Sequence, residues 1–398
     1  MSSRGVSDLV ERVRGAGAGA LSMGVSAAAV ALALGVSLLV VAASGADPGE
    51  SIGALIDGAM GSQAATTASL AKAVPLGLAA LGWIVAWQAR RLNIGLEGQM
   101  LLGGAASAFI GTQLSELPTF VHLPLAVAAG AVGGALWAGI AAVLWVKRGV
   151  NEIFSTLMLN LVALQVVEWL IRGPLAEGAS ASFARTAAMS ESARWGRVVG
   201  SYVLSWDWVV LVGAVIVVGF VLPRTVAGYR LRLVGANPEA ATFAGIKAQR
   251  TAALALVGSG ALAGLAGSSL ILAGETYRMT DGFAGGGGYL AIVVALVAAN
   301  APLGVLPAAV FFGALRQGGG LLEARAGVPS PIINVVTGLI IVFLAAAARP
   351  TQRLRTRAAA RSRAPRTDPV VTIAAPDGGA TSDDHPPARA PQPVGGTP

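Results

Sequence analysis

The sequence predicts an all-α polytopic membrane protein, and two features of the chain lead to that prediction. Hydrophobic residues make up 55% of the 398 residues and charged residues only 12%, whereas soluble domains carry about 25% charged residues. The apolar residues also occur in long runs, and about 20 apolar residues are enough for a helix to cross a bilayer. We therefore expect about ten transmembrane helices.

Ten hydrophobic segments follow one another along the chain. They cover residues 21–44, 70–88, 100–114, 123–146, 153–171, 208–222, 252–273, 289–299, 303–315 and 332–347. The third, eighth and ninth are shorter than a full span, which predicts tilted, broken or re-entrant elements. The pairs Gly130 with Gly134 and Gly260 with Gly264 have the G-x-x-x-G spacing that lets membrane helices pack closely.

The basic residues predict the orientation of the chain in the membrane. Residues 1–20 carry Arg4, Arg12 and Arg14 ahead of an apolar run that is too long for the core of a signal peptide. We expect them to form a cytoplasmic segment before a retained first helix. With both termini inside (N-in and C-in), most of the 28 Lys and Arg residues lie on the cytoplasmic side, as the positive-inside rule requires. Arg316 is among the few assigned to the outer side.

Residues 349–398 form a basic, Pro-rich stretch with almost no large apolar side chains. This composition predicts a disordered cytoplasmic tail. Its basic beginning, Arg353 to Arg366, is expected to hold the last helix at an anionic inner leaflet, and a regulatory role is the alternative. Residues 21–348 are then the transmembrane domain.

The composition also argues against several chemistries. The chain has no Cys and only two His residues, His122 and His385, so a thiol site, a His-based triad or a multi-His metal site is not expected. It contains no G-x-x-x-x-G-K-[ST] motif for binding ATP. We expect no catalytic residue, no metal and no cofactor. The net charge of +8 is explained by membrane orientation, so no nucleic-acid partner is expected.

The first polar interruption of the apolar pattern comprises Asn93, Glu97 and Gln99, interspersed with Gly95 and Gly98. Irregular backbone survives at membrane depth only against protein or a water-filled path. One interpretation is therefore a bent segment that lines a translocation route. The other is a short inner-side loop in which Glu97 pairs with the basic residues just before it, at 90 and 91.

The second interruption lies at the start of segment 153–171. Asn151 is a natural N-cap, and Glu152 suits the positive end of the helix that follows. Glu152, Thr156 and Asn160 recur every four residues and so share one helix face. For Asn151 and Glu152 the alternative to a route is a cap with interhelical hydrogen bonds, and for Asn160 it is helix–helix bonding.

The third interruption predicts a short cytoplasmic helix at about residues 237–246. Asn237 is the expected N-cap, Pro238 suits the first helical position, and Glu239 lies beside the positive helix end. Gly245 ends the helix two turns later. A helix this short is unstable alone, so it needs a partner surface.

Four stretches in this order resemble the permease subunits of bacterial ABC importers, in the branch that handles nucleosides and simple sugars. They are L-N-I-G-L-E-G-Q at 92–99, G-V-N-E-I-F-S-T-L-M-L-N at 149–160, G-A-N-P-E-A-A-T-F-A-G-I at 235–246, and G-Y-L-A-I-V-V-A-L with N-A-P-L-G downstream at 288–304. The third looks like the E-A-A-x-x-x-G core of permease loops that contact the ATPase. The resemblance implies ATPase-coupling residues Asn237, Pro238, Glu239, Ala240, Ala241 and Gly245.

The resemblance implies a complex rather than a single-chain transporter. Its partners are an ABC ATPase, a second permease subunit that is expected to be a related chain, and an extracellular substrate-binding protein. ATP hydrolysis then takes place on the partner, in a multi-pass assembly surrounded by the lipids of the bacterial plasma membrane.

The expected function is therefore a translocation path for a small neutral polar substrate, a nucleoside or a simple sugar. The candidate path residues are Asn93, Glu97, Gln99, Glu152, Thr156 and Asn160. The alternative is a secondary transporter or a channel for a small polar solute. Ion coupling would predict charged pairs in mid-span, and the segments above are expected to hold almost none. An intramembrane enzyme would need a dyad or a metal cluster, for which the carboxylates lack the spacing.

Overall fold

The computed structural model describes residues 47–178, 184–198, 200 and 202–326, with the isolated positions 35, 36, 39, 42 and 338. Within these residues the chain is mostly helical, and its only β-pairing consists of isolated bridges. Apart from those isolated positions, the predicted N-terminal segment 1–20, the spans 21–44 and 332–347 and the tail 349–398 lie outside the described residues.

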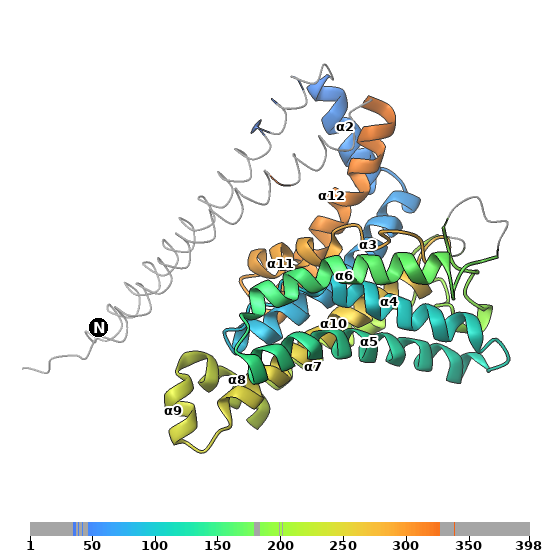
Figure 1. Ribbon diagram of the computed structural model, residues 1–398. Coiled ribbons are helices and arrows are strands. Elements are labelled where there is room, and N and C mark those ends of the chain that lie inside the picture. Colours follow the sequence, from blue (N-terminus) through green and yellow to red (C-terminus); the bar gives the residue numbers. More distant parts are fainter. Residues whose placement is uncertain are drawn as a thin grey trace, which may run out of the picture.

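Eleven α-helices and two short 3₁₀ helices follow one another in the described chain (Figure 1). The α-helices are α2 (Pro48–Met60), α3 (Gln63–Gln88), α4 (Leu96–Gln113), α5 (Thr119–Arg148), α6 (Glu152–Arg172), α7 (Trp208–Arg224), α8 (Val226–Ala236), α9 (Pro238–Phe243), α10 (Ala248–Leu272), α11 (Gly287–Val297) and α12 (Val305–Ala326). The 3₁₀ helices are η1 (Glu191–Ala193) and η2 (Pro302–Gly304).

Five helices are long and apolar enough to cross a membrane: α3, α5, α6, α10 and α12 with η2. Helices α7 and α8 together form a sixth candidate, bent by 68° where they meet. The predicted segments 70–88, 123–146, 153–171, 208–222 and 252–273 correspond to α3, α5, α6, α7 and α10. The described chain thus contains five to six candidate spans.

The three segments predicted to be short have different outcomes. Segment 289–299 is the short helix α11, so its predicted shortness is confirmed. Segment 100–114 lies in α4, which is helical but is not among the candidate spans. Segment 303–315 was expected to be short, which is wrong, because α12 continues to Ala326. Helix α2 was not predicted at all.

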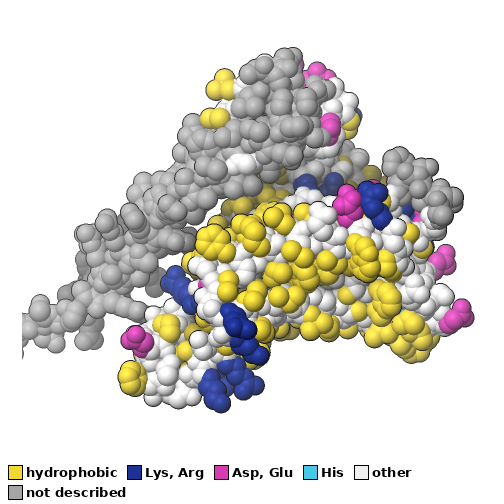
Figure 2. All heavy atoms as spheres, viewed as in Figure 1, with side chains coloured by type: hydrophobic (Ala, Val, Ile, Leu, Met, Phe, Trp, Pro, Cys, Tyr) yellow, Lys and Arg dark blue, Asp and Glu magenta, His cyan; other side chains and the backbone are white. Residues whose placement is uncertain are grey.

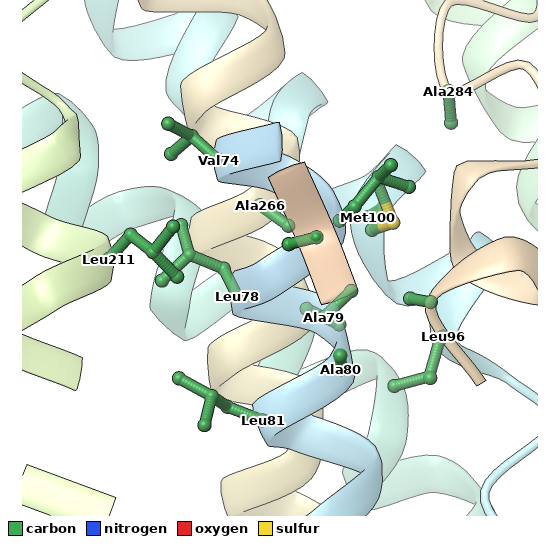
Figure 3. Close-up of a cluster of buried hydrophobic side chains, with 14 of the residues drawn as sticks. Val74, Leu78, Ala79, Ala80, Leu81, Leu96, Met100, Leu211, Ala266 and Ala284 are labelled. Atoms are coloured by element: carbon green, nitrogen blue, oxygen red, sulfur yellow. The ribbon is translucent and has the colours of Figure 1, made fainter. Parts of the chain in front are cut away.

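Helix α3 lies at the centre of the bundle. Its buried face packs against Leu96 and Met100 of α4, Leu211 of α7 and Ala266 of α10 (Figure 3). The outer helices α5, α6 and α7 instead expose large apolar side chains along their length, as lipid-facing helices do. Figure 2 shows such side chains spread over the middle of the face it presents.

The two G-x-x-x-G pairs pack against each other, which confirms the predicted close approach. A Cβ atom placed on Gly134 would overlap the carbonyl oxygen of Gly260, and one on Gly264 would overlap that of Gly130. Helices α5 and α10 therefore cross with their backbones in direct contact. Small residues make such contacts possible in membrane bundles.

The bundle has two distinct ends. At the first, which we call the coupling end because the predicted coupling helix lies there, α9 packs where α3 and α5 finish and α10 begins, through Ala241, Ala89, Trp145 and Ala252. Basic side chains gather there in Figure 2. At the other, the loop end, the connection after α6 meets the connection after α10, where Thr186 N–H donates to the Met279 carbonyl (3.0 Å).

Candidate functional site

A buried carboxylate holds the beginning of α11. The Glu97 side chain, at the start of α4, accepts hydrogen bonds from the backbone N–H groups of Gly286 (2.9 Å) and Gly288 (2.7 Å). The first N–H groups of a helix have no partner within the helix, and the helix dipole favours a negative charge there. Glu97 thus caps α11 from another helix. The alternative in which Glu97 pairs with Arg90 or Arg91 is wrong, because Arg91 pairs elsewhere and Glu97 faces α11.

Asn93 and Gln99 form a fully buried pair beside Glu97. The Asn93 amide donates to Gln99 Oε1 (2.8 Å) and to Ser259 Oγ of α10 (2.8 Å), and its oxygen accepts from the Gln99 amide (3.0 Å). The same oxygen accepts from the backbone N–H of Gly95 (3.0 Å). The last of these bonds satisfies a backbone N–H in the non-helical segment between α3 and α4, as irregular backbone at membrane depth requires.

Asn160 connects α6 to both α4 and α11. Its amide donates to the Ile94 carbonyl (2.9 Å) and to the Tyr289 hydroxyl (3.0 Å), and its oxygen accepts from Gly98 N–H (2.9 Å). Thr156, one turn earlier, is also buried, and its hydroxyl donates to the Glu152 carbonyl (2.6 Å). Asn160 therefore makes the interhelical hydrogen bonds that were one of the two interpretations of its place in the sequence.

Glu152 lies at the coupling end and not with the buried cluster. Its carboxylate pairs with the Arg91 guanidinium (3.2 Å), which also stacks 4.5 Å from the centre of the Trp145 ring. Asn151 accepts from Ile153 N–H (2.8 Å), as the predicted N-cap should. The predicted cap and interhelical contact are thus both present, and the pair ties the end of α3 to the start of α6.

Two charged residues within spans were missed. Arg316, which was assigned to an outer loop, lies inside α12, and its guanidinium donates to the Gly285 carbonyl (2.8 Å). Lys72 lies within α3. Both residues lie in helices that are long and apolar enough to cross a membrane, so the candidate spans carry these few charges. The signal was in the sequence, since each residue interrupts an apolar stretch, and charges at membrane depth are costly and functional.

Arg316 and Glu97 hold the glycine-rich turn before α11 from both sides. Gly285 (φ +54°) and Gly286 (φ +75°) lie in the left-handed region that glycine adopts without strain. The Gly285 carbonyl accepts a hydrogen bond from the Arg316 guanidinium, and the Gly286 N–H donates one to the Glu97 carboxylate. We call Asn93, Glu97, Gln99, Thr156, Asn160 and Arg316 the polar cluster.

Helix α9 has the predicted ends. Asn237 Oδ1 accepts from the N–H groups of Glu239 (3.0 Å) and Ala240 (3.0 Å), and Pro238 takes the first helical position. Gly245 adopts a φ of +77° just beyond the helix. Each of these local features was predicted from the sequence and is confirmed.

The faces of α9 were not predicted. Ala241 is fully buried and packs on Ala89, Val234 and Ala252 of the same chain. Phe243, which the sequence reasoning missed, is 94% exposed at the last helical position. One face of α9 therefore fixes the helix to its own bundle, and an aromatic side chain projects from another.

Asp207 is a further buried acid, at the loop end and away from the polar cluster. Its carboxylate accepts from the hydroxyls of Ser269 (2.5 Å) and Ser205 (3.0 Å). Burial raises its pKa from 3.8 to about 6, and the two hydroxyl hydrogen bonds oppose that rise. The contacts position the start of α7.

Comparisons with known proteins identify similar chains. Residues 65–345 match the family described as the branched-chain amino acid transport system / permease component. The glucose ABC transporter permease protein TsgB13 of Haloferax volcanii is 35% identical over 316 residues, which cover 77% of this chain and 82% of the relative. The guanosine ABC transporter permease protein NupP of Bacillus subtilis is 30% identical over 312 residues, with 77% and 88% covered.

A third relative has a similar extent of match. The nucleoside ABC transporter permease protein NupB of Lactococcus lactis subsp. cremoris is 30% identical over 324 residues, which cover 77% of this chain and 86% of the relative. No solved structure matches the chain.

Proposed function

This chain belongs to the permease family described as the branched-chain amino acid transport system / permease component, and from that premise we propose that it forms the path by which an ABC importer carries a nucleoside or a simple sugar. It is an ABC transporter permease subunit and a multi-pass protein of the bacterial plasma membrane. Glucose, guanosine and nucleosides are the solutes in the names of three relatives.

The proposed topology has about ten spans with both termini inside and the coupling end in the cytoplasm. Residues 1–20 and 349–398 are then cytoplasmic, on either side of the permease domain 21–348. The gathering of Lys and Arg at the coupling end supports this orientation. A reporter fused after Pro398 is expected to be active only inside the cell, and one inserted near Ser190 only outside. The reverse result at either site would overturn the topology.

The observation that carries the proposed function is the shape of α9. A six-residue helix is too short to be stable alone, yet this one is capped at both ends and packed on three neighbouring elements. Its aromatic residue, Phe243, is almost fully exposed and is therefore available to a partner. We propose that α9 docks on the ATPase that hydrolyses ATP for the complex, through the stretch that contains Asn237, Pro238, Glu239, Ala240, Ala241 and Gly245.

For the route, we propose that the polar cluster and the turn before α11 border the solute. Glu97 and Arg316 fix a glycine-rich turn whose backbone groups suit hydrogen bonding to a neutral polar solute. Asn93, Gln99, Thr156 and Asn160 support this turn from behind, and Glu152 borders the route at the coupling end. Movement of α9 by the ATPase would reach the cluster through α10, which carries Ser259.

The proposal also predicts the partners of the chain. Besides the ATPase, they are a second, related permease subunit and an extracellular substrate-binding protein. The test is uptake by proteoliposomes that contain the full chain, recovered from native membranes with the subunits that co-purify. We expect ATP-dependent uptake of labelled guanosine or glucose, with unlabelled nucleosides and sugars as competitors to distinguish the two.

The matched control is the same complex with an ATPase that cannot hydrolyse ATP. Uptake that proceeds equally with this control would refute the ABC importer and favour a channel. The route has its own test in the Cys-free sequence, because single cysteines at 93, 97, 99, 152, 156 and 160 can be exposed to a polar thiol reagent. If none of the six reacts in any nucleotide state, the route lies elsewhere.

A further inference from the structure

A groove opens between α5 and α10 at the coupling end. Its volume is about 870 Å³, and Gly139, Ala142, Ala253 and Val257 form its apolar interior. A Cβ atom on Gly139 would meet nothing within 4 Å, whereas one on Gly134 would overlap the opposite helix. The two helices that touch at their glycine crossing therefore leave an open space beside Gly139.

The groove faces outward, on the side of the bundle that carries exposed apolar side chains. Val143 of α5 is 51% exposed and Leu254 of α10 is 60% exposed, and both line the groove. Continuous apolar exposure of this kind is what the hydrocarbon of a bilayer covers in a membrane protein. The interior of the groove thus offers an apolar slot to whatever lies against these two helices.

Three cations stand where the groove reaches the coupling end. Lys147 follows the apolar part of α5, and Lys247 and Arg250 flank the start of α10. All three are exposed, and none forms an ion pair with another residue of the described chain. An apolar slot that ends in three unpaired cations is complementary to a molecule with a long hydrocarbon chain and an anionic head.

We propose that this groove binds an anionic phospholipid of the inner leaflet, with an acyl chain against Gly139 and the phosphate headgroup among Lys147, Lys247 and Arg250. Each cation near an anionic membrane surface is attracted to it, so three together select an anionic over a zwitterionic headgroup. A neutral lipid would leave the cations without a counter-charge, and a polar protein segment would leave the apolar interior unsatisfied.

The bound lipid would also contact the turn after α9. Thr242, Gly245 and Ile246 form one wall of the groove, so the headgroup lies beside the segment proposed to reach the ATPase. The inference rests on the coupling end lying at a membrane surface. Its test measures lipid binding directly, so its failure is distinguishable from a failure of the proposed transport function.

The experiment uses the full chain, purified in detergent and titrated with phosphatidylglycerol or with phosphatidylcholine of the same acyl chains. Native mass spectrometry counts the bound lipid and gives an apparent Kd for each. We expect phosphatidylglycerol to bind at least about tenfold more tightly, from the attraction of three cations. Combined replacement Lys147→Gln, Lys247→Gln and Arg250→Gln should abolish this preference. Gly139→Leu should weaken the binding of both lipids, because the leucine side chain fills the apolar part of the groove.

Matched variants control for charge and for bulk. Arg224→Gln, Arg230→Gln and Arg232→Gln together remove the same number of cations at the coupling end but outside the groove. Gly213→Leu adds the same side chain on α7, where a Cβ also meets nothing within 4 Å. Thermal melting in detergent verifies that every variant is folded. Both controls should keep the preference for phosphatidylglycerol.

Three results would overturn the proposal. The first is equal affinity of the unaltered chain for the two lipids. The second is loss of the preference in the controls as well as in the groove variants. The third is a photo-crosslink from a single cysteine at Val143 that captures the ATPase or a second permease rather than lipid in native membranes, because a protein would then occupy the groove.

Discussion

Replacement of Phe243 by alanine removes an aromatic side chain that makes little contact with the described part of its own chain. The residue ends α9 and is 94% exposed. Full burial of a phenylalanine side chain contributes about 1.5–3 kcal/mol, and alanine recovers little of that. If Phe243 is buried when the ATPase docks, the alanine variant should bind the ATPase about 2 kcal/mol more weakly, which is about 30-fold in Kd.

The assay is a titration of the purified ATPase against the permease complex in nanodiscs, read by fluorescence of a labelled ATPase. We expect the melting temperature of the variant to stay unchanged, because the lost side chain makes little contact with its own bundle. ATP-dependent uptake should fall together with ATPase binding. Phe120→Ala is the matched control, since Phe120 is 79% exposed at the loop end, where no ATPase is expected.

Ala241→Arg perturbs the same helix from its buried side. Ala241 is fully buried against Ala89, Val234 and Ala252, and a buried charge without a partner costs several kcal/mol. We expect α9 to lose its position, so that the chain remains inserted in the membrane but no longer co-purifies with the ATPase. Glu239→Ala should be milder, because it removes one charge at the helix end.

The two variants separate docking from positioning. An unchanged Kd for Phe243→Ala would refute the reasoning, because the exposed face of α9 would then not be the docking surface. Normal ATPase binding by Ala241→Arg would show in addition that the position of α9 on its own bundle does not matter for coupling.

Three further predictions concern the interior. Glu97→Gln replaces a carboxylate that accepts two backbone hydrogen bonds, and a lower melting temperature with a loss of about 1–3 kcal/mol is expected; no change would contradict the capping of α11. Asp207 has a pKa of about 6 in the folded protein and 3.8 ordinarily. The free energy of unfolding should therefore fall by about 3 kcal/mol as the pH rises from below the lower pKa to above the higher one, because only the unfolded state gives up the proton easily. Asp207→Asn should remove this pH dependence in denaturation curves. Gly134→Leu should abolish accumulation of folded protein, and Gly139→Leu should leave it intact, both judged by size-exclusion chromatography; equal accumulation would contradict the close crossing of α5 and α10.

The sequence by itself determined the features that depend on neighbouring residues. The composition predicted the membrane class, and apolar runs located five of the helices, although α3 begins at Gln63 and not at residue 70. Asn237 with Gly245 and Asn151 with its following turn predicted helix ends, because a cap uses side chains and backbone groups only a few residues apart. The G-x-x-x-G pairs predicted close packing, since absence of a side chain is a local property.

Only the tertiary structure decided which groups far apart in the sequence meet. Glu97 binds backbone groups 189 and 191 residues away, and Arg91 pairs with Glu152, 61 residues away. No pattern in a single sequence shows which residues so far apart in the chain are in contact. The sequence therefore suggested Arg90 or Arg91 as the partner of Glu97, because they are the nearest basic residues along the chain. The face of α9 was equally undetermined, because six residues make fewer than two turns and show no apolar periodicity. The surrounding bundle decides that Ala241 is buried and Phe243 exposed, because burial depends on which surfaces α3, α8 and α10 present to that helix.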